Sequence, residues 1–190
     1  MSRRVILFGC QAISIDILKF LFAQTDVEVL KVITYEVSSD ISRGQESIKT
    51  VASELGIDVS SPSRVSDKLV EEIKNLQPDL IISAYYRKIF PEKLIDIPRL
   101  GIVNIHPSLL PSFKGAHAVK QSLDAGVKIS GCTVHWVDKG MDTGKIISQL
   151  SCCVLDNDSE ESLSEKIHLL EHKIYPETIK ELIKDITYVN

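Results

Sequence analysis

Short apolar segments alternate with amphipathic segments along the first hundred residues. Runs rich in aliphatic and β-branched side chains predict buried strands over 5–8, 27–35, 80–83 and 101–105, and a brief one over 57–59. Between these runs, apolar side chains recur every three or four residues, which predicts helices over 12–23, 46–55 and 66–76. Pro91 is expected to open a further short helix, because proline suits the first helical position.

This alternation predicts an α/β fold. Strands that are apolar on both faces are typical of parallel sheets covered by helices on both sides. After a helix over 116–125 the pattern changes, and residues 132–137 and 145–155 predict an antiparallel addition. A final helix is expected to start near Asp158 or Ser159, and Pro176 should kink it or split it in two. We therefore predict a Rossmann-like open, mostly parallel sheet with helices on both faces, a C-terminal antiparallel addition and a long final helix, forming a single domain over 1–190.

Composition narrows the function classes without choosing one. The net charge of −4 argues against a broad nucleic-acid surface, and no apolar run approaches the roughly 20 residues that span a bilayer. Four cysteines without a Cys-x-x-Cys pair predict reduced thiols, and hence a cytoplasmic protein without a metal centre. We expect small-molecule partners, no nucleic acid or membrane partner, and a monomer or homodimer.

Three polar side chains suggest chemistry in the second half of the chain. Asn104 and His106 stand two residues apart at a strand end, so they point to the same side. Parallel sheets bind ligands at the carboxyl ends of their strands. Asp142 follows in a glycine-flanked loop, and its carboxylate would stabilise a protonated His106. Together the three groups could hold an oxyanion and move protons while an amine attacks a carbonyl.

The motifs around these residues resemble a known family. The chain contains Asn104-x-His106-Pro-Ser-Leu-Leu-Pro, then Gly115, then Gly-Cys-Thr-Val-His135, then Met-Asp142-x-Gly-x-Ile-Ile. This pattern is similar to the formyltransferase superfamily, which uses 10-formyltetrahydrofolate. Within it, Glu-His-x-x-Tyr-Pro over 171–176 resembles the glycinamide ribonucleotide formyltransferases of purine biosynthesis.

The resemblance implies a role for each matching residue. Asn104 would bind the formyl oxygen, His106 would act as general acid, and Asp142 would tune His106 in a direct transfer. Residues 1–100 would form the acceptor side, and residues 101–190 the catalytic and folate-binding half. Contacts to 10-formyltetrahydrofolate are implied for Arg64, Arg87, Lys88, Ile89, Phe90, Val137, Asp138, Gly140 and Met141. Contacts to the acceptor are implied for Gly9, Cys10, Gln11 and Glu171.

The turn after the first strand departs from the family pattern. Glycinamide ribonucleotide formyltransferases carry Gly-x-Gly-Ser-Asn there, whose backbone donors hold the substrate phosphate. Here the turn is Gly9-Cys-Gln-Ala-Ile-Ser14, in which Gln11 and Ser14 could supply side-chain donors. An amino-sugar nucleotide is therefore an alternative acceptor. Methionyl-tRNA is expected less, because those enzymes normally carry an extra C-terminal domain, whereas this chain ends at Asn190.

Other expectations stay open at this stage. A formyl-folate hydrolase or folate-binding module is an alternative class, although such hydrolases usually carry an added N-terminal domain and strand one begins here at Arg4. His135 could face either the ligand or the core. The Leu110–Pro111 bond is expected to be cis, and the polar loop over 36–46 could close over the acceptor.

Overall fold

The computed structural model describes residues 2–10, 12–35 and 46–185. Gln11 and almost all of the loop expected to close over the acceptor lie outside the described residues. The elements are β1 (Arg3–Gly9), α1 (Ala12–Phe22), β2 (Val27–Ile33), α3 (Ile48–Glu54), β3 (Val59–Ser60), α4 (Asp67–Leu76), β4 (Leu80–Ala84), α5 (Glu92–Ile95), β5 (Gly101–His106), α6 (Ala118–Asp124), β6 (Ile129–Trp136), β7 (Ile146–Cys153) and α7 (Glu160–Asp185).

The strands hydrogen-bond in the order β3-β2-β1-β4-β5-β6-β7. Strand β1 runs parallel to both β2 and β4, whereas β6 and β7 are antiparallel. The predicted fold class, a mostly parallel α/β sheet with an antiparallel addition and a long last helix, is therefore confirmed. The chain order reverses between β1 and β4, and such switch points are where open α/β sheets bind ligands.

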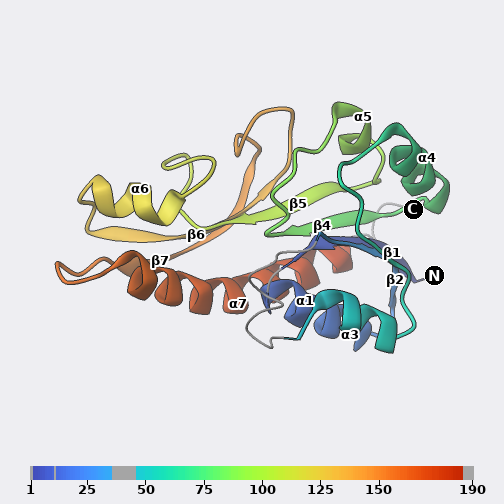
Figure 1. Cartoon of the computed structure of the whole chain (residues 1–190), viewed down its shortest axis with the longest axis horizontal. Helices are drawn as coiled ribbons and strands as arrows, with labels where there is room; N and C mark the ends of the chain where they lie inside the picture. The colour runs from blue at the N-terminus through green and yellow to red at the C-terminus, as the bar shows by residue number, and fades with distance from the viewer. Residues whose placement is uncertain (1, 11, 36–45, 186–190) are drawn as a thin grey trace. The chain divides into compact units, whose positions relative to one another are not determined.

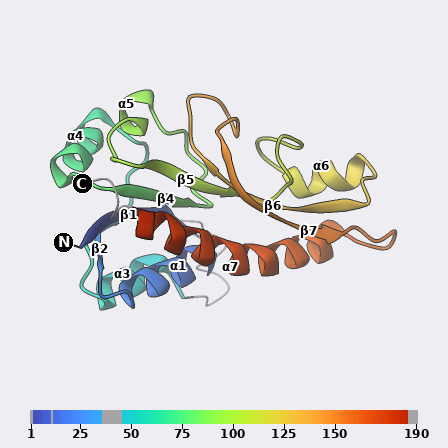
Figure 2. The same ribbon diagram turned by 180° about the vertical axis from the view of Figure 1, so that it is seen from behind.

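The chain divides into two compact units, Met1–Val103 with Ile183–Asn190, and Asn104–Leu182. In the first unit, α1 and α3 lie on one face of the strands, and α4 and α5 lie on the other (Figures 1 and 2). Its core is built on β1, where Val5 to Phe8 are fully buried because the strand is central. Ser47 and Ser66 cap α3 and α4 through their hydroxyl groups.

In the second unit, α6 and α7 lie on opposite faces of the β6–β7 pair (Figures 1 and 2). Ser159 accepts a hydrogen bond from the backbone N–H of Ser162, as expected of a cap on α7. The prediction that Pro176 could split the last helix is wrong, because α7 continues through it. Tyr175 and Ile179 on either side are fully buried, so packing holds the helix where the proline removes a backbone donor.

Smaller features also bear on the sequence-based expectations. The brief third strand lies at Val59–Ser60 rather than 57–59. The Leu110–Pro111 peptide bond is cis, as predicted. Among the described residues, no helix has both the length and the apolar character needed to cross a membrane.

Candidate active site

The imidazole of His106, at the end of β5, faces one acceptor at each nitrogen. Its Nε2 lies 2.8 Å from the backbone carbonyl oxygen of Phe113, and its Nδ1 lies 3.4 Å from Oδ2 of Asp142. A carbonyl can only accept, so Nε2 must carry a proton. The nitrogen that can gain and lose a proton is therefore Nδ1, beside the carboxylate.

Backbone geometry holds the Asp142 carboxylate in place. Its Oδ2 accepts a hydrogen bond from the Gly115 N–H at 2.7 Å, and Asp142 itself adopts a left-handed φ of 51°. The preceding loop is shaped by Asp138, whose Oδ1 accepts from the Gly140 N–H at 3.0 Å and from the Thr143 hydroxyl at 2.6 Å. The bond from Thr143 lowers the pKa of Asp138.

Asn104 contacts the same cluster through His135, a residue that the sequence could not assign to the ligand side or to the core. Its Nδ2 lies 3.3 Å from Nε2 of His135, and that nitrogen lies 3.7 Å from Oδ1 of Asp142. Only 2% of His135 is exposed, and its Nδ1 lies 2.9 Å from the Trp136 carbonyl oxygen. The structure thus brings Asn104, His106 and Asp142 into one cluster, with His135 as a fourth member.

A polar network centred on the buried Thr133 supports the loop that carries the Phe113 carbonyl. The Thr133 hydroxyl donates to the Ser108 carbonyl at 2.6 Å and accepts from the Leu110 N–H at 3.0 Å. Gln149 Nε2 donates to both the Leu110 carbonyl and the Thr133 hydroxyl, at 3.0 and 2.9 Å. Residues of β6 and β7 therefore fix the loop that anchors Nε2 of His106. Sequence patterns do not single out Gln149, because it occupies an ordinary polar position of a strand.

In the first unit, the turn after β1 is closely packed. A Cβ on Gly9 would lie 2.3 Å from the Ser14 hydroxyl, so only glycine fits there. Ser14 is fully buried and donates to the Ala84 carbonyl at 2.9 Å, rather than offering its hydroxyl to a ligand as the sequence suggested. The Cys10 thiol donates to the Tyr85 carbonyl at 3.0 Å.

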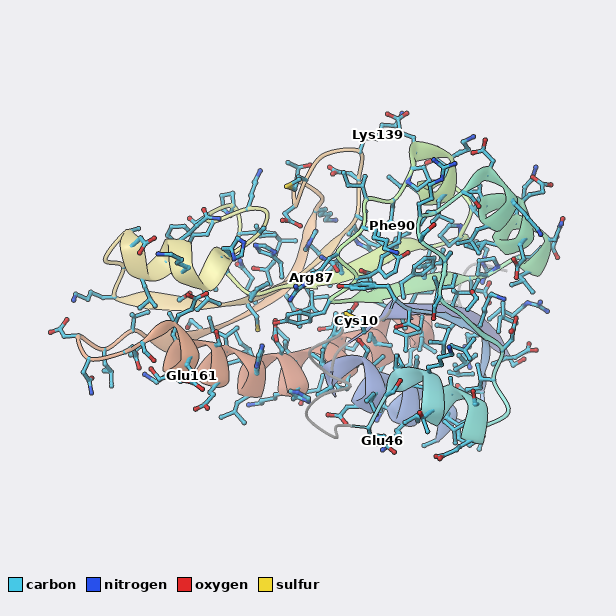
Figure 3. The ribbon with its side chains drawn as sticks, in the orientation of Figure 1. Cys10, Glu46, Arg87, Phe90, Lys139 and Glu161 are labelled. Atoms are coloured by element: carbon cyan, nitrogen blue, oxygen red, sulfur yellow. The ribbon has the colours of Figure 1, made fainter. Side chains whose placement is uncertain are left out.

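Aromatic side chains gather beside this turn. Tyr86 packs edge-on against Phe8 and stacks on Phe90, with centroids 4.9 and 5.6 Å apart. Tyr35 lies 5.7 Å from the Tyr86 ring and donates from its hydroxyl to the Tyr85 carbonyl at 3.3 Å. Burial, with the nearby Cys10, raises the pKa of Tyr86 to about 12. Cys10, Arg87 and Phe90 all follow strands of this unit (Figure 3).

The residues implied in folate binding have side chains whose charge and polarity suit that ligand. Arg64 and Arg87 are exposed cations in the first unit, suited to carboxylates, and Ile89 is 83% exposed. Lys88 donates to the Pro62 carbonyl at 2.7 Å, and Phe90 packs into the aromatic cluster. In the second unit, Asp138, Gly140 and Met141 are exposed in the β6–β7 loop and Val137 is half-buried; Lys139 lies at the loop's tip (Figure 3). Exposed apolar side chains such as Ile89 and Met141 suit an aromatic ring system.

Glu171 differs from the other implied contacts because its side chain is fully buried. Burial, together with the Glu171 carboxylate, raises the pKa of Cys132 to about 12, so that thiol is an unreactive core group. Contact between Glu171 and an acceptor stays a prediction. Within the described ranges, no three His, Cys, Asp or Glu side chains are grouped so that they could hold a metal ion.

The chain is similar in sequence to formyl transferases. Residues 14–179 match the family model described as formyl transferase. Methionyl-tRNA formyltransferase from Thermodesulfovibrio yellowstonii is 34% identical over 98% of this chain and 61% of its own length. Phosphoribosylglycinamide formyltransferase from Bacillus subtilis is 44% identical over 60% of this chain and 59% of its own length. In each case the match spans about three fifths of the relative.

Solved structures of phosphoribosylglycinamide formyltransferases are similar to this chain in fold. The phosphoribosylglycinamide formyltransferase of Anaplasma phagocytophilum superposes with a TM-score of 0.82 at 33% identity, covering 97% of this chain and 89% of its own. The enzyme of the same name from Bacillus halodurans gives a TM-score of 0.80 at 32% identity, covering 95% of both chains.

Proposed function

We propose, from the premise that this chain belongs to the formyl transferase family, that it transfers a formyl group from 10-formyltetrahydrofolate to a primary amine. The observation that carries the reaction is the approach of His106 Nδ1 to Asp142 Oδ2, at 3.4 Å, in one cluster with the Asn104 amide. An imidazole, a carboxylate and an amide are the groups that direct acyl transfer to an amine requires.

Asn104, His106 and Asp142 have separate roles in the proposed transfer. The folate supplies the formyl carbon and the leaving nitrogen. The Asn104 amide donates to the formyl oxygen as negative charge develops there, and one such donor is typically worth about 3–4 kcal/mol. The acceptor amine attacks the formyl carbon, and the bond from that carbon to the folate nitrogen breaks. His106 keeps its Nε2 proton in the hydrogen bond to the Phe113 carbonyl and delivers a proton from Nδ1 to the leaving nitrogen. The proton that the amine loses returns to Nδ1 of His106. Asp142 stabilises the positive charge that the ring carries during this step.

The 10-formyltetrahydrofolate would be held by groups of matching chemistry. In the first unit, the exposed Arg64 and Arg87 have the charge that suits its carboxylates, and Ile89 has an exposed apolar side chain. In the second unit, backbone groups of the Val137–Met141 segment have the donors and acceptors that suit the pterin ring. This assignment rests on the exposure and charge of those side chains and on the family pattern.

For the acceptor, we propose the amine of glycinamide ribonucleotide. The names and high structural similarity of the solved relatives support this choice, as does the 44% identical relative from Bacillus subtilis. Phosphoribosylglycinamide is the substrate in their names, and purine biosynthesis would then be the pathway of this chain. We propose a cytoplasmic monomer or homodimer, without metal, nucleic-acid or membrane partners.

One observation favours a second acceptor, an amino-sugar nucleotide. In the turn expected to hold a phosphate, the side chains of Ser14 and Cys10 donate hydrogen bonds to the carbonyls of Ala84 and Tyr85. The Tyr35 ring beside that turn is half-buried, so part of its apolar face is accessible. Such a surface suits a sugar ring better than a phosphate group.

The decisive experiment offers the protein several acceptors in parallel. Purified protein and 10-formyltetrahydrofolate are incubated with glycinamide ribonucleotide, an amino-sugar nucleotide, methionyl-tRNA or no acceptor, and tetrahydrofolate release is followed. We expect turnover with glycinamide ribonucleotide that His106→Ala abolishes. Preferred turnover of another amine would overturn the acceptor, and formate release without any amine would replace transfer by hydrolysis.

A further inference from the structure

His135 lies where it can control the catalytic amide. It is the next-to-last residue of β6, at a point where the register against β7 shifts between Val134 and His135. Its side chain is buried, and its Nε2 meets the Nδ2 atom of Asn104 at 3.3 Å. All of these groups belong to the second compact unit.

The contacts of the ring determine which nitrogen carries its proton. The Trp136 carbonyl, 2.9 Å from Nδ1, can only accept, so Nδ1 must be protonated. An amide nitrogen can only donate, so Nε2 must offer its lone pair to Asn104. Both contacts are satisfied only by the neutral ring with its proton on Nδ1.

Burial and the groups around the ring shift the pKa of His135 in opposite directions. Burial lowers the pKa of His135 and is the largest influence, and His106 acts in the same direction. The Trp136 carbonyl, Asp142 and Asp138 favour protonation but do not outweigh burial. Asp142 Oδ1 lies 3.7 Å from Nε2, beyond ordinary hydrogen-bonding distance.

We propose that His135 is a positioning residue, whose neutral Nε2 accepts one N–H of Asn104 and thereby holds the amide with its other N–H available to the formyl oxygen. The catalytic part of this inference rests on the proposed formyl transfer. A protonated Nε2 would attract the amide oxygen of Asn104 instead, and the amide would turn over. His135 would then act without touching the reacting atoms.

Two matched substitutions separate this role from simple packing. In His135→Gln, the side-chain oxygen reaches the place of Nε2 and can accept from Asn104. In His135→Asn, the shorter amide reaches the place of Nδ1 but not Asn104. We expect His135→Asn to lower kcat by about 10- to 100-fold, with the KM for formyl-folate roughly unchanged, because a misplaced catalytic group costs up to about that factor. His135→Gln should recover most of the loss, and His117→Asn, at an exposed position, should match the parent protein.

Nitrogen NMR of histidine-labelled parent protein gives a readout that needs no acceptor and no variant to remain folded. We expect His135 to show an unprotonated Nε2 and a protonated Nδ1 at neutral pH, with Nε2 remaining unprotonated after exposed histidines have titrated. A protonated Nε2 at neutral pH would overturn the proposal, as would a folded His135→Asn protein with parental kcat. If the parent protein transfers no formyl group to any amine, the proposed function fails, while the spectrum still decides the contact between His135 and Asn104.

Discussion

The backbone N–H of Gly115 donates to Oδ2 of Asp142 across 2.7 Å, and the same oxygen faces Nδ1 of His106. Gly115 has a φ of +78°, and a Cβ there would lie 3.0 Å from the Met141 sulfur. The position of the carboxylate therefore depends on a glycine 27 residues earlier in the chain.

Gly115→Ala tests this dependence. A left-handed conformation costs a non-glycine residue about 1–2 kcal/mol, so urea unfolding should show a loss of that size. Because the N–H donor moves with the strained backbone, kcat should also fall by roughly tenfold. Gly126→Ala is the control, since Gly126 has a φ of +66° and open space around it. Gly126→Ala should lose similar stability and keep its kcat; equal kcat values in the two variants would contradict the link.

Asp142→Asn removes the charge beside His106 while keeping an oxygen that can accept from Gly115. We expect kcat to fall by about 100-fold, because proton transfer by a positioned side chain typically contributes that much or more. Single-turnover measurements of tetrahydrofolate release check the chemical step. Asp124→Asn, on the exposed ion pair with Lys120, should leave kcat unchanged. A full rate in Asp142→Asn would remove the carboxylate from the mechanism.

Asp158 should make the protein lose stability in acid. Hydrogen bonds from Lys166, from the Leu155 N–H and from Ser162 lower its pKa from 3.8 to about 2. A folded-state pKa below the unfolded value means that the contribution is complete above pH 3.8 and disappears as the pH falls towards 2. Asp158→Asn should therefore lower the melting temperature at neutral pH, and the difference from the parent protein should shrink between those two pH values.

The control for that experiment is Asp156→Asn. Asp156 pairs with the exposed Lys128 and has a side chain that is 91% exposed, so little change is expected at any pH. Parallel melting curves of Asp158→Asn and the parent protein down to the acid limit would contradict the assignment.

Tyr86→Phe should stabilise the protein. The Tyr86 hydroxyl is buried and has no hydrogen-bond partner among the described residues, and such a group typically costs about 1–3 kcal/mol. We expect the free energy of unfolding in urea to rise by about 1 kcal/mol. Tyr35→Phe, which loses the bond to the Tyr85 carbonyl, should instead be neutral or destabilised. A destabilised Tyr86→Phe protein would mean that the hydroxyl has a partner in solution.

Site residues could be predicted from the sequence where the underlying rule involves only residues that are close together in the chain. Two-residue spacing at a strand end was sufficient to put Asn104 and His106 on one side, and the formyl transfer motifs supplied Asp142. The role of His135 could not be read from strand alternation, because the register shift beside it leaves no mark in the sequence. Its partners, the Trp136 carbonyl and Asn104, are set by the fold.

Other differences arise because packing overrides local preference. Pro176 favours a break, but the buried Tyr175 and Ile179 keep α7 whole. Ser14 has a hydroxyl that could bind a ligand or a carbonyl, and only the proximity of Ala84 in space selects the carbonyl. The same applies to Glu171, whose full burial cannot be inferred from its place on an amphipathic helix.

The bond from His106 Nε2 to the Phe113 carbonyl also determines how the ring would respond to covalent reagents. An electrophile alkylates an imidazole at the nitrogen that carries a free lone pair, and here Nε2 has none to offer. A formyl-folate analogue bearing a reactive carbon in place of the formyl group would therefore attach at Nδ1. The site of attachment, which distinguishes two isomeric adducts, follows from one backbone carbonyl seven residues away.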